Sequence, residues 1–298
     1  MRNTSSEKNL KEKISEKKSL YNYTRSIYRT YCNLVGGFHT LPDFLIIGSK
    51  KSGTTSLYRY LTTHPSVIPA ATKEVGYFDR YYEKGEKWYR MNFPSRWGGK
   101  SKSNSGKTMH ITGEATPTYI YHPHAPQRVF KLLPNIKLIV MLRNPVDRTY
   151  SQYNMEANNH TNEDLTFEEA IEKEPERLEG EFEKMEKDGN YFSYNYYTFS
   201  YLTSSIYVEQ LERWFKYFPR EQFLIINGDD LKKNVECVFQ NILNFLNIPN
   251  FNLEKYEEIG KRKYPKMNPE TRKKLVEFFK PHNERLYKLL GTNFHWDE

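Results

Sequence analysis

The most constraining feature of the sequence is a glycine-rich turn between a short apolar run and a helical pattern. The run Pro42–Gly48 (PDFLIIG) is typical of a buried parallel strand, and Gly48 and Gly53 lie five residues apart in the turn. Glycines at this spacing let successive backbone N–H groups face one centre. The helix dipole, the hydroxyls and a lysine strengthen the attraction for an anion. The turn therefore predicts a phosphate-binding site at the carboxyl end of a strand.

The turn differs from a Walker A loop in the position of its positive charge. In that loop, Lys and then Ser or Thr follow the last glycine, whereas here Thr54 follows Gly53 and the lysines precede it. A magnesium-dependent nucleotide enzyme also needs a carboxylate or an equivalent ligand at a strand end. The apolar run 136–145 ends instead in Arg143 and Asn144. These differences favour a phosphate ligand that is bound without a metal.

Two further apolar runs, 136–145 and 222–227, have the character of buried strands, and helical patterns lie between and after the three runs. Strands that alternate with helices indicate an α/β fold with a central parallel sheet and helices on both faces. No internal repeat or low-complexity linker follows Leu41. We therefore expect residues 1–40 to form a charged appendage and residues 41–298 to form one domain.

The charge of the chain favours an anionic partner. Its 298 residues include 45 Lys and Arg against 37 Asp and Glu, a formal net charge of +8. Residues 163–188 hold an excess of acids and are expected to form a solvated helix, so the remainder is more basic than the total indicates. Nucleic acid, acidic lipid, a phosphorylated cofactor and a polyanionic substrate are all compatible with this balance.

The cysteines and the N-terminus indicate the cellular compartment in which the protein functions. The two cysteines, Cys32 and Cys237, are too few for a disulfide framework or a Cys-based zinc site, which favours a reducing compartment. The N-terminus lacks the apolar core of a secretory signal, and no window approaches about 18 uninterrupted apolar residues. We therefore expect a cytoplasmic protein without a transmembrane segment. His122 and His124 lack a third ligand at useful spacing, so no metal is expected.

Two more segments carry chemistry. Arg143 lies at the predicted carboxyl end of the second strand, and Ser151 follows about two helical turns later. Because parallel strands end at the same edge of a sheet, both side chains are within reach of a second phosphate beside the first. The aromatic run 191–201 (YFSYNYYTFSY) has two interpretations. Its rings either bind a sugar face or a hydrophobic alcohol, or they belong to the core.

Together these segments resemble the PAPS-dependent sulfotransferases, in the branch that contains the heparan sulfate sulfotransferases and their bacterial-type relatives. The likeness covers about residues 41–298 and is carried, in order, by KKSGTTSLYRYLTTHP, KEVGYFD, GEATPTYIY, LRNPVDRTYSQY, QLERWFKYFPREQFLIINGDDL, GKRKYPKMNPETRKKLVEFFKPHNERLYKLLG and HWDE. The resemblance implies transfer of the sulfuryl group of 3′-phosphoadenosine 5′-phosphosulfate (PAPS) to a hydroxyl or amine, leaving the bisphosphate PAP. A carbohydrate is the acceptor expected first, with a lipid or small alcohol as alternatives.

The resemblance also implies which residues bind PAPS. The 5′-phosphosulfate would lie in the glycine-rich turn, at Lys51, Ser52, Gly53, Thr54 and Thr55. The 3′-phosphate would be held by Arg143 and Ser151. A basic loop near the C-terminus would close over the nucleotide, with Arg262 as its main charge contact. The residues of this loop are Gly260, Lys261, Arg262, Lys263 and Tyr264.

The resemblance implies two catalytic residues. The segment Glu74–Phe78 (EVGYF) is similar to the one that carries the family's catalytic glutamate, so Glu74 would take the proton of the acceptor. The alternative is that Glu74 is a structural ion-pair partner of Lys73 or Lys51. Lys51 would stabilise the charge on the leaving group. Some relatives have a second lysine where this chain has Ala115, so that role has no assigned residue here.

Two other classes of function compete with this interpretation. A P-loop kinase or another nucleotide phosphotransferase is disfavoured by the displaced lysine. A basic protein that binds RNA or a membrane surface through its N-terminal arm would account for the charge and the tyrosines. With Lys51, Arg143 and Arg262 assigned to a nucleotide with two phosphate-bearing ends, nucleic acid is not the partner we expect.

Overall fold

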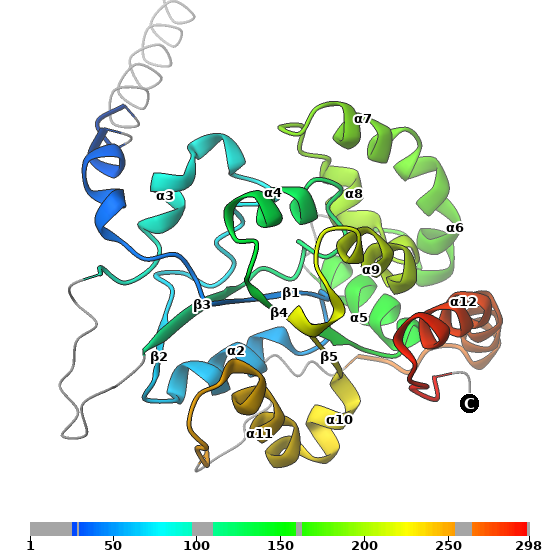
Figure 1. The fold of residues 1–298 in the computed structure, drawn as a ribbon. Helices are drawn as coiled ribbons and strands as arrows, with labels where there is room; N and C mark the ends of the chain where they lie inside the picture. The colour runs from blue at the N-terminus through cyan, green and yellow to red at the C-terminus, as the bar shows by residue number, and fades with distance from the viewer. Residues whose placement is uncertain (1–25, 29, 97–109, 159–162, 254–263, 297–298) are drawn as a thin grey trace, which may run out of the picture.

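The structure, a computed structural model, describes residues 26–28, 30–96, 110–158, 163–253 and 264–296. Its centre is a parallel sheet of five strands in the order β2-β3-β1-β4-β5 (Figure 1). The strands are β1 (Phe44–Gly48), β2 (Val67–Pro69), β3 (Ile111–Ala115), β4 (Lys137–Leu142) and β5 (Phe223–Asn227). The predicted α/β fold with a central parallel sheet is confirmed.

Helices cover both faces of the sheet (Figure 1). One face packs against α2 (Thr54–Thr63) and α11 (Val235–Leu246), and the other against α4 (Ala125–Leu132) and α9 (Tyr207–Phe215). The other α-helices are α3 (Glu86–Arg90), α5 (Pro145–Asn158), α6 (Phe167–Leu178), α7 (Glu181–Lys187), α8 (Tyr194–Phe199), α10 (Gly228–Lys233) and α12 (Pro269–Leu290). The 3-10 helices are η1 (Gly36–Phe38), η2 (Tyr82–Lys84), η3 (Thr203–Ser205) and η4 (Arg220–Gln222). Residues 26–28 and 30–35 are also helical.

Strand β1 is buried on both faces. Leu45 and Ile47 join the core under α4 and α9, whereas Phe44 and Ile46 join the core under α2 and α11. Successive side chains of a strand point to opposite faces, so a strand covered on both sides needs an apolar residue at nearly every position. This requirement explains the continuous apolar run in the sequence.

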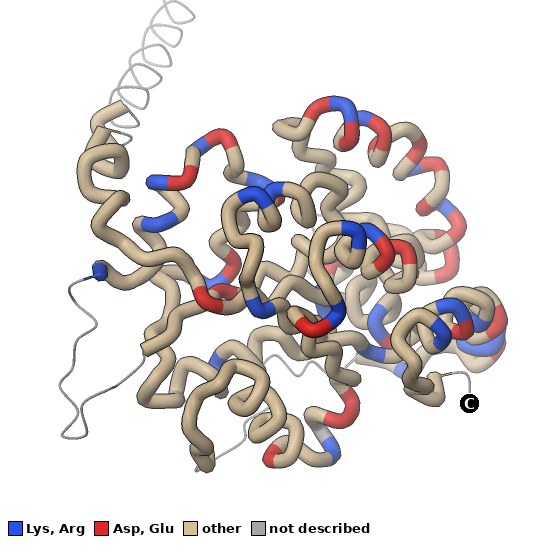
Figure 2. The backbone as a smooth tube through the Cα atoms, viewed as in Figure 1, with Lys and Arg blue, Asp and Glu red and all other residues tan. Residues whose placement is uncertain are grey.

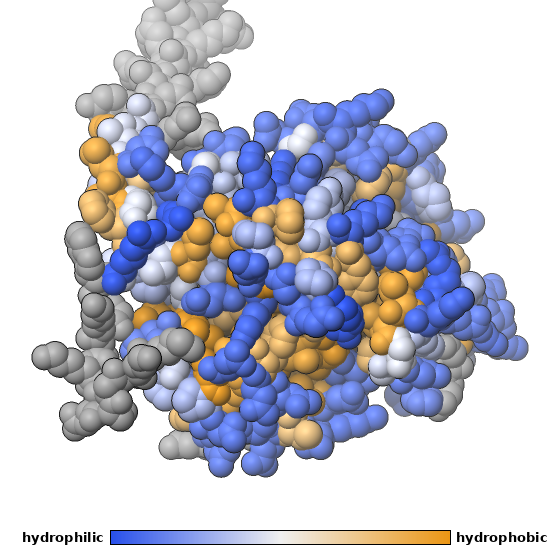
Figure 3. Space-filling model, in the orientation of Figure 1, coloured by the Kyte–Doolittle hydropathy of each residue, from blue (hydrophilic) through white to orange (hydrophobic). Residues whose placement is uncertain are grey.

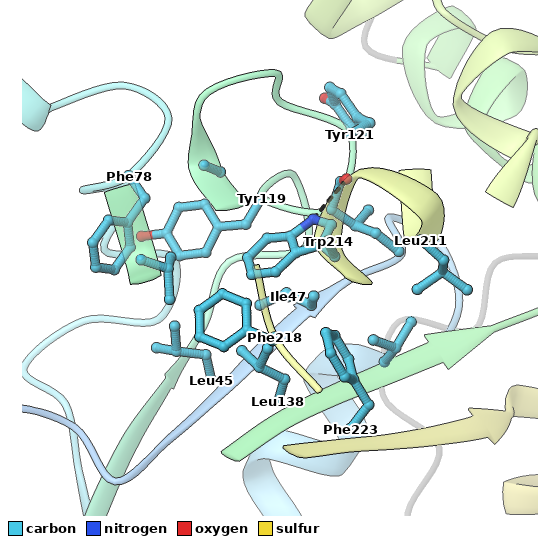
Figure 4. Packing of buried hydrophobic residues seen from close by; sticks show 14 of the residues in the cluster. Leu45, Ile47, Phe78, Tyr119, Tyr121, Leu138, Leu211, Trp214, Phe218 and Phe223 are labelled. Atoms are coloured by element: carbon cyan, nitrogen blue, oxygen red, sulfur yellow. Dashed lines mark hydrogen bonds between the residues drawn. The ribbon is translucent and has the colours of Figure 1, made fainter. Parts of the chain in front are cut away.

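Trp214 of α9 lies at the centre of the larger core cluster (Figure 4). Its side chain is fully buried and its ring stacks on Phe218, with 5.9 Å between the ring centres. The indole Nε1 donates a hydrogen bond to the carbonyl of Ile120 at 3.0 Å (Figure 4). This bond ties α9 to the segment that follows β3.

Two strands were not predicted from the sequence. We expected three strands, but β2 and β3 complete one side of the sheet. β3 reads ITGEA, and its polar side chains are buried in hydrogen bonds rather than in apolar contacts. The hydroxyl of Thr112, for example, donates to the carbonyl of Ile68 on β2 at 2.7 Å. Strands of this composition carry no apolar pattern from which to predict them.

The acidic stretch forms α6 and α7 rather than one solvated helix. Glutamates are interspersed with Lys and Arg along these helices (Figure 2). However, Glu163, Glu174 and Glu181 are buried, so the prediction of full solvation is wrong for them. The carboxylate of Glu174, for example, accepts the backbone amides of Leu202 and Thr203 at 2.6 and 2.8 Å. These acids hold α6 and α7 against the segments around α8.

The surface shown in Figure 3 is mostly hydrophilic, but apolar side chains are visible over the helical residues 26–28 and 30–35. Ile27 and Leu34 are exposed there. Among the described residues, we find no helix with the length and apolar character that a membrane crossing requires. Cys32 is buried and Cys237 is exposed, and both are free thiols.

Gly113 of β3 provides a test of the packing between β3 and β1. A Cβ atom at this position would lie 2.6 Å from three ring atoms of Phe44, its register partner on β1. We expect Gly113→Ala to lower the free energy of unfolding by about 1–3 kcal/mol, because the buried ring has no free space into which to move. Gly37→Ala, with nothing within 4 Å of its Cβ, is the control. Denaturant unfolding that gives equal midpoints for both variants would contradict the described contact.

Candidate functional site

The glycine-rich turn lies between β1 and α2, at the carboxyl edge of the sheet. The backbone amide of Ser49 donates to the carbonyl of Met141 on β4 at 2.7 Å. The amide of Ser52 donates to the carbonyl of Ser49 at 3.2 Å, and the two serine Oγ atoms lie 2.6 Å apart. Short local bonds therefore close the turn and fix it against the neighbouring strand.

The N-terminus of α2 has no side-chain cap. Its N-cap residue is Gly53, whose φ of 94° lies in the left-handed region that favours glycine. Because the N-cap glycine has no side chain to accept from the first amides of the helix, these amides can bind an external anion. Thr54 is buried and Thr55 is exposed at this first turn. The predicted phosphosulfate-binding residues thus surround an uncapped helix end.

The two adjacent lysines of the turn differ in environment. Lys51 is half-buried and has a φ of 70°. Lys50 points inward, where its Nζ lies 3.0 Å from Oε1 of Glu156 and 5.0 Å from the ring centre of Tyr197. Burial lowers the pKa of Lys50, and the carboxylates of Glu156 and Glu74 oppose that shift. Glu74 is therefore within electrostatic reach of the turn.

Arg143 follows β4 and reaches the glycine-rich turn. Its Nη1 donates to the carbonyl of Lys51 at 3.3 Å. Its Nε is buried and has no hydrogen-bond partner among the described residues, so this charged donor can bind a phosphate oxygen. Ser151 is buried on α5, the helix that follows Arg143. Because β1 and β4 pair side by side, the two predicted anion sites share one edge of the sheet.

The predicted basic loop is described only at its end. Gly260, Lys261, Arg262 and Lys263 lie outside the described residues. The ring of Tyr264 lies 5.5 Å from that of Tyr150, and the hydroxyl of Tyr150 donates to the carbonyl of Pro265 at 3.0 Å. Since Tyr150 directly precedes Ser151, the end of this loop is anchored on α5 beside the proposed 3′-phosphate site.

Glu74 lies on the segment after β2, with a φ of 63°. Its side chain is 37% exposed, and its carboxylate lies 2.9 Å from Nζ of Lys73 and 3.9 Å from Nη2 of Arg80. Glu74 therefore forms the ion pair with Lys73 that its alternative, structural interpretation predicts. A half-exposed pair of this kind contributes only about 0–1 kcal/mol to stability, so it leaves the carboxylate available to a substrate.

The sequence did not identify Glu114 as part of the site. This residue of β3 is fully buried, and its Oε1 accepts hydrogen bonds from the hydroxyls of Tyr89 and Tyr119 at 2.8 and 2.9 Å. Its Oε2 accepts the hydroxyl of Thr116 at 2.7 Å. Burial raises the pKa of Glu114 to about 7, and these hydrogen bonds oppose the rise. An acid within the otherwise uncharged run ITGEATPTYIY was the available signal.

The hydroxyls that bind Glu114 also hold the segment of Glu74. The amide of Gly76 donates to Oγ1 of Thr116 at 3.2 Å, and the amide of Tyr77 donates to the hydroxyl of Tyr119 at 2.8 Å. The amide of Glu74 donates to the carbonyl of Ala115 at 3.2 Å. These three backbone hydrogen bonds therefore hold the segment of Glu74 against β3 and the residues that follow it.

Comparisons with known proteins agree with this geometry. A family model described as "Sulfotransferase domain" matches residues 41–285. The membrane-associated sulfotransferase kil1 of Dictyostelium discoideum is 28% identical over 97% of this chain and 72% of its own length. Heparan sulfate glucosamine 3-O-sulfotransferase 5 of Mus musculus is 30% identical over 86% of this chain and 74% of its own length. The crystal structure of a sulfotransferase from Alicyclobacillus acidocaldarius matches 87% of this chain and 100% of its own, with 26% identity and a TM-score of 0.67.

Glu114 should make stability depend on pH. Its pKa rises from 4.5 to about 7 on folding, so between these values the folded state holds a proton that the unfolded chain releases. The free energy of unfolding is therefore highest below pH 4.5, where the carboxyl is protonated in both states. It falls as the pH rises through about 7. We therefore expect Glu114→Gln, which does not titrate, to gain about 3 kcal/mol relative to the wild type across this range.

Denaturant unfolding of both proteins from pH 4.5 to pH 7.5 measures this difference. Glu277→Gln, at an exposed position of α12, is the matched control. A flat difference for Glu114→Gln would show that folding does not perturb this carboxyl.

Proposed function

The chain belongs to the sulfotransferase domain family, and from this premise we propose that it transfers the sulfuryl group of PAPS to an acceptor hydroxyl or amine. One observation carries the proposal. The uncapped start of α2 and Arg143 lie at the ends of two adjacent strands, and Arg143 contacts the turn at 3.3 Å. PAPS carries a 5′-phosphosulfate and a 3′-phosphate, so two neighbouring anion sites suit this donor.

The described residues fit such a donor. The phosphosulfate is proposed to bind the backbone and side chains of the turn, at Lys51, Ser52, Gly53, Thr54 and Thr55. The 3′-phosphate is proposed to bind the hydroxyl of Ser151 and the Nε of Arg143, which no described residue contacts by a hydrogen bond. A helix N-terminus and an arginine are each suited to bind an anionic phosphate group.

In the proposed reaction, the acceptor oxygen or nitrogen forms a bond to sulfur as the bond between sulfur and the bridging phosphate oxygen breaks. The electron pair of the broken bond leaves with PAP. Glu74 takes the proton of the acceptor, and the Lys51 ammonium offsets the charge on the bridging oxygen. In-line transfer requires Glu74 and Lys51 to act from opposite sides of the sulfuryl group.

A carbohydrate is the acceptor class that we propose first. The name of the Mus musculus relative gives heparan sulfate glucosamine as its acceptor. The aromatic run 191–201 supports the same class, because it is only partly core: Tyr196 is buried, whereas Phe192 and Tyr194 are exposed. A lipid or a small alcohol is the alternative.

A comparison of nucleotide ligands distinguishes a sulfotransferase from a kinase and from an RNA-binding protein. We expect PAP to raise the Tm of the protein, because a ligand at 100 times its Kd stabilises a fold by about 2.7 kcal/mol. ATP with magnesium should raise it less, and a short RNA should have no effect. A larger shift with ATP than with PAP would favour a kinase and overturn the donor assignment.

Arg143→Ala should weaken PAP binding at least tenfold, since a hydrogen bond to a charged group is worth about 1.5–3 kcal/mol. Calorimetric titration with PAP measures this loss. Arg220→Ala is the matched control, because Arg220 precedes β5 and lies at the opposite end of the strands. An unchanged Kd for Arg143→Ala would exclude a role in binding the 3′-phosphate.

Glu74→Gln should lower kcat by about 10²–10⁴-fold while the Kd for PAP changes less than twofold, because the amide cannot take the proton. Transfer of labelled sulfate from PAPS measures the first quantity, and calorimetry measures the second. Glu83→Gln, an exposed glutamate nearby, should behave as the wild type. Parallel loss of turnover and PAP binding would instead assign Glu74 to nucleotide binding or to local structure.

A further inference from the structure

Arg148 of α5 is a fully buried arginine whose hydrogen-bond partners are all neutral groups. Its Nε donates to Oγ of Ser205 at 2.6 Å, and its Nη2 donates to Oε1 of Gln152 and to the carbonyl of Tyr201, both at 2.8 Å. Its Nη1 lies 3.5 Å from the carbonyl oxygen of Lys50. Buried charges are usually paired, because burying an unpaired charge is costly. The position of this guanidinium therefore needs an explanation.

The acidic residues around Arg148 contact other groups. Among the residues that the structure describes, none forms an ion pair with Arg148. The carboxylate of Glu156 lies 3.0 Å from Nζ of Lys50. The carboxylate of Glu174 accepts two backbone amides and acts on Arg148 only through its longer-range charge. Arg148 is therefore hydrogen-bonded, but no carboxylate neutralises it by direct contact.

Two other cations lie within electrostatic reach of Arg148. Burial lowers the pKa of Arg148; the charge of Glu174 opposes this shift, and the charge of Arg143 adds to it. Burial likewise lowers the pKa of Lys50; Glu156 opposes that shift, and the charge of Arg148 adds to it. Arg148 therefore repels both Arg143 and Lys50. An anion bound near these side chains would offset the repulsion.

Arg148 is connected to both predicted anion sites. Through the carbonyl of Lys50 it contacts the glycine-rich turn, one residue before Lys51. Ser151 follows Arg148 by three residues on α5, and side chains three residues apart are neighbours on a helix surface. The residues proposed to bind the phosphosulfate and the 3′-phosphate are thus both adjacent to this buried charge.

Two of the acceptors around Arg148 have other hydrogen-bond partners. The carbonyl of Tyr201 also accepts the hydroxyls of Thr149 and Ser205, each at 3.0 Å. Oγ of Ser205 lies 2.7 Å from Oγ1 of Thr149. Hydrogen bonding of these groups therefore does not by itself require a guanidinium at this position, which leaves the charge as the property to be explained.

We propose that Arg148 is a positioning residue for the sulfate donor, whose buried charge attracts the phosphate groups of PAPS from beneath the glycine-rich turn. Arg148 does not touch the nucleotide. It holds the turn through the carbonyl of Lys50, and the negative charge of the nucleotide stabilises the guanidinium in return. This inference rests on the proposed function and adds to the donor site a residue outside the set that binds the nucleotide directly.

Two variants of Arg148 separate its charge from its hydrogen bonds. Arg148→Lys keeps the charge without the planar fork, whereas Arg148→Gln keeps a hydrogen-bond donor without the charge. We expect Arg148→Gln to raise the Kd for PAP about tenfold or more and Arg148→Lys to stay within about threefold of the wild type, because the charge acts over a distance. Calorimetric titration of the full chain with PAP measures both values. Arg220→Gln, before β5 at the opposite end of the strands, is the matched control for loss of charge and should leave the Kd unchanged.

Gln152→Glu tests the charge without replacing Arg148. The new carboxylate keeps an acceptor for Nη2 of Arg148 and supplies the ion-pair partner from within the protein. The proposal predicts a Kd for PAP that is about tenfold or more above that of the wild type. A role through hydrogen bonds alone predicts no change, since the bond to Arg148 is retained. Denaturant unfolding without nucleotide shows which variants fold, and if Arg148→Gln does not fold, Gln152→Glu decides the question.

Three other results would overturn the proposal, each in a recognisable way. PAP binding with the wild-type Kd in Arg148→Gln and Gln152→Glu would refute the role of the charge and leave the donor assignment intact. Equal losses of affinity in Arg148→Lys and Arg148→Gln would assign Arg148 to the hydrogen bonding of the turn instead. Absence of PAP binding to the wild type would refute the donor assignment and this inference together.

Discussion

The position of β1 between β3 and β4 is the constraint on which the candidate site depends. Parallel pairing brings the carboxyl ends of these three strands to one edge of the sheet. The glycine-rich turn, Arg143 and the segment after Glu114 leave the sheet at this edge. β1 is buried on both faces, so a one-residue shift in its register would exchange the side chains that fill the two cores and disturb the packing of both. The relative placement of the two predicted anion sites is therefore set by the core.

The segment of the proposed base depends instead on polar contacts. Glu114 accepts hydrogen bonds from the hydroxyls of Tyr89, Thr116 and Tyr119. The hydroxyls of Thr116 and Tyr119 in turn accept hydrogen bonds from backbone amides in the segment of Glu74. Burying a carboxylate is costly unless it is hydrogen-bonded. Hydrogen bonds to a charged group contribute about 1.5–3 kcal/mol each, so three of them offset most of that cost. The half-exposed carboxylate of Glu74 is therefore held in place by the buried hydrogen bonds around Glu114.

Much of the fold could be predicted because its central strands and main helices have simple patterns. β1, β4 and β5 are continuous apolar runs. β3 could not be predicted, since Gly113 and Glu114 are stabilised by contacts with distant segments. The turn and Arg143 could be placed because each directly follows a predicted strand. The different environments of Lys50 and Lys51 could not be predicted, because the ion-pair partner of Lys50 is Glu156, which lies 106 residues away in the sequence. Long-range polar pairs of this kind leave no local pattern in the sequence.

The backbone at Lys51 and Glu74 has a consequence for how such a protein changes under selection. Both residues adopt left-handed φ values, 70° and 63°, where a side chain costs about 1–2 kcal/mol relative to glycine. Glycine at either position would relieve the strain but remove a charge that the proposed reaction uses. Heat resistance and turnover therefore favour different residues at these two positions. A laboratory selection for heat resistance alone would discard both charges, and only a screen that also demands turnover would retain them.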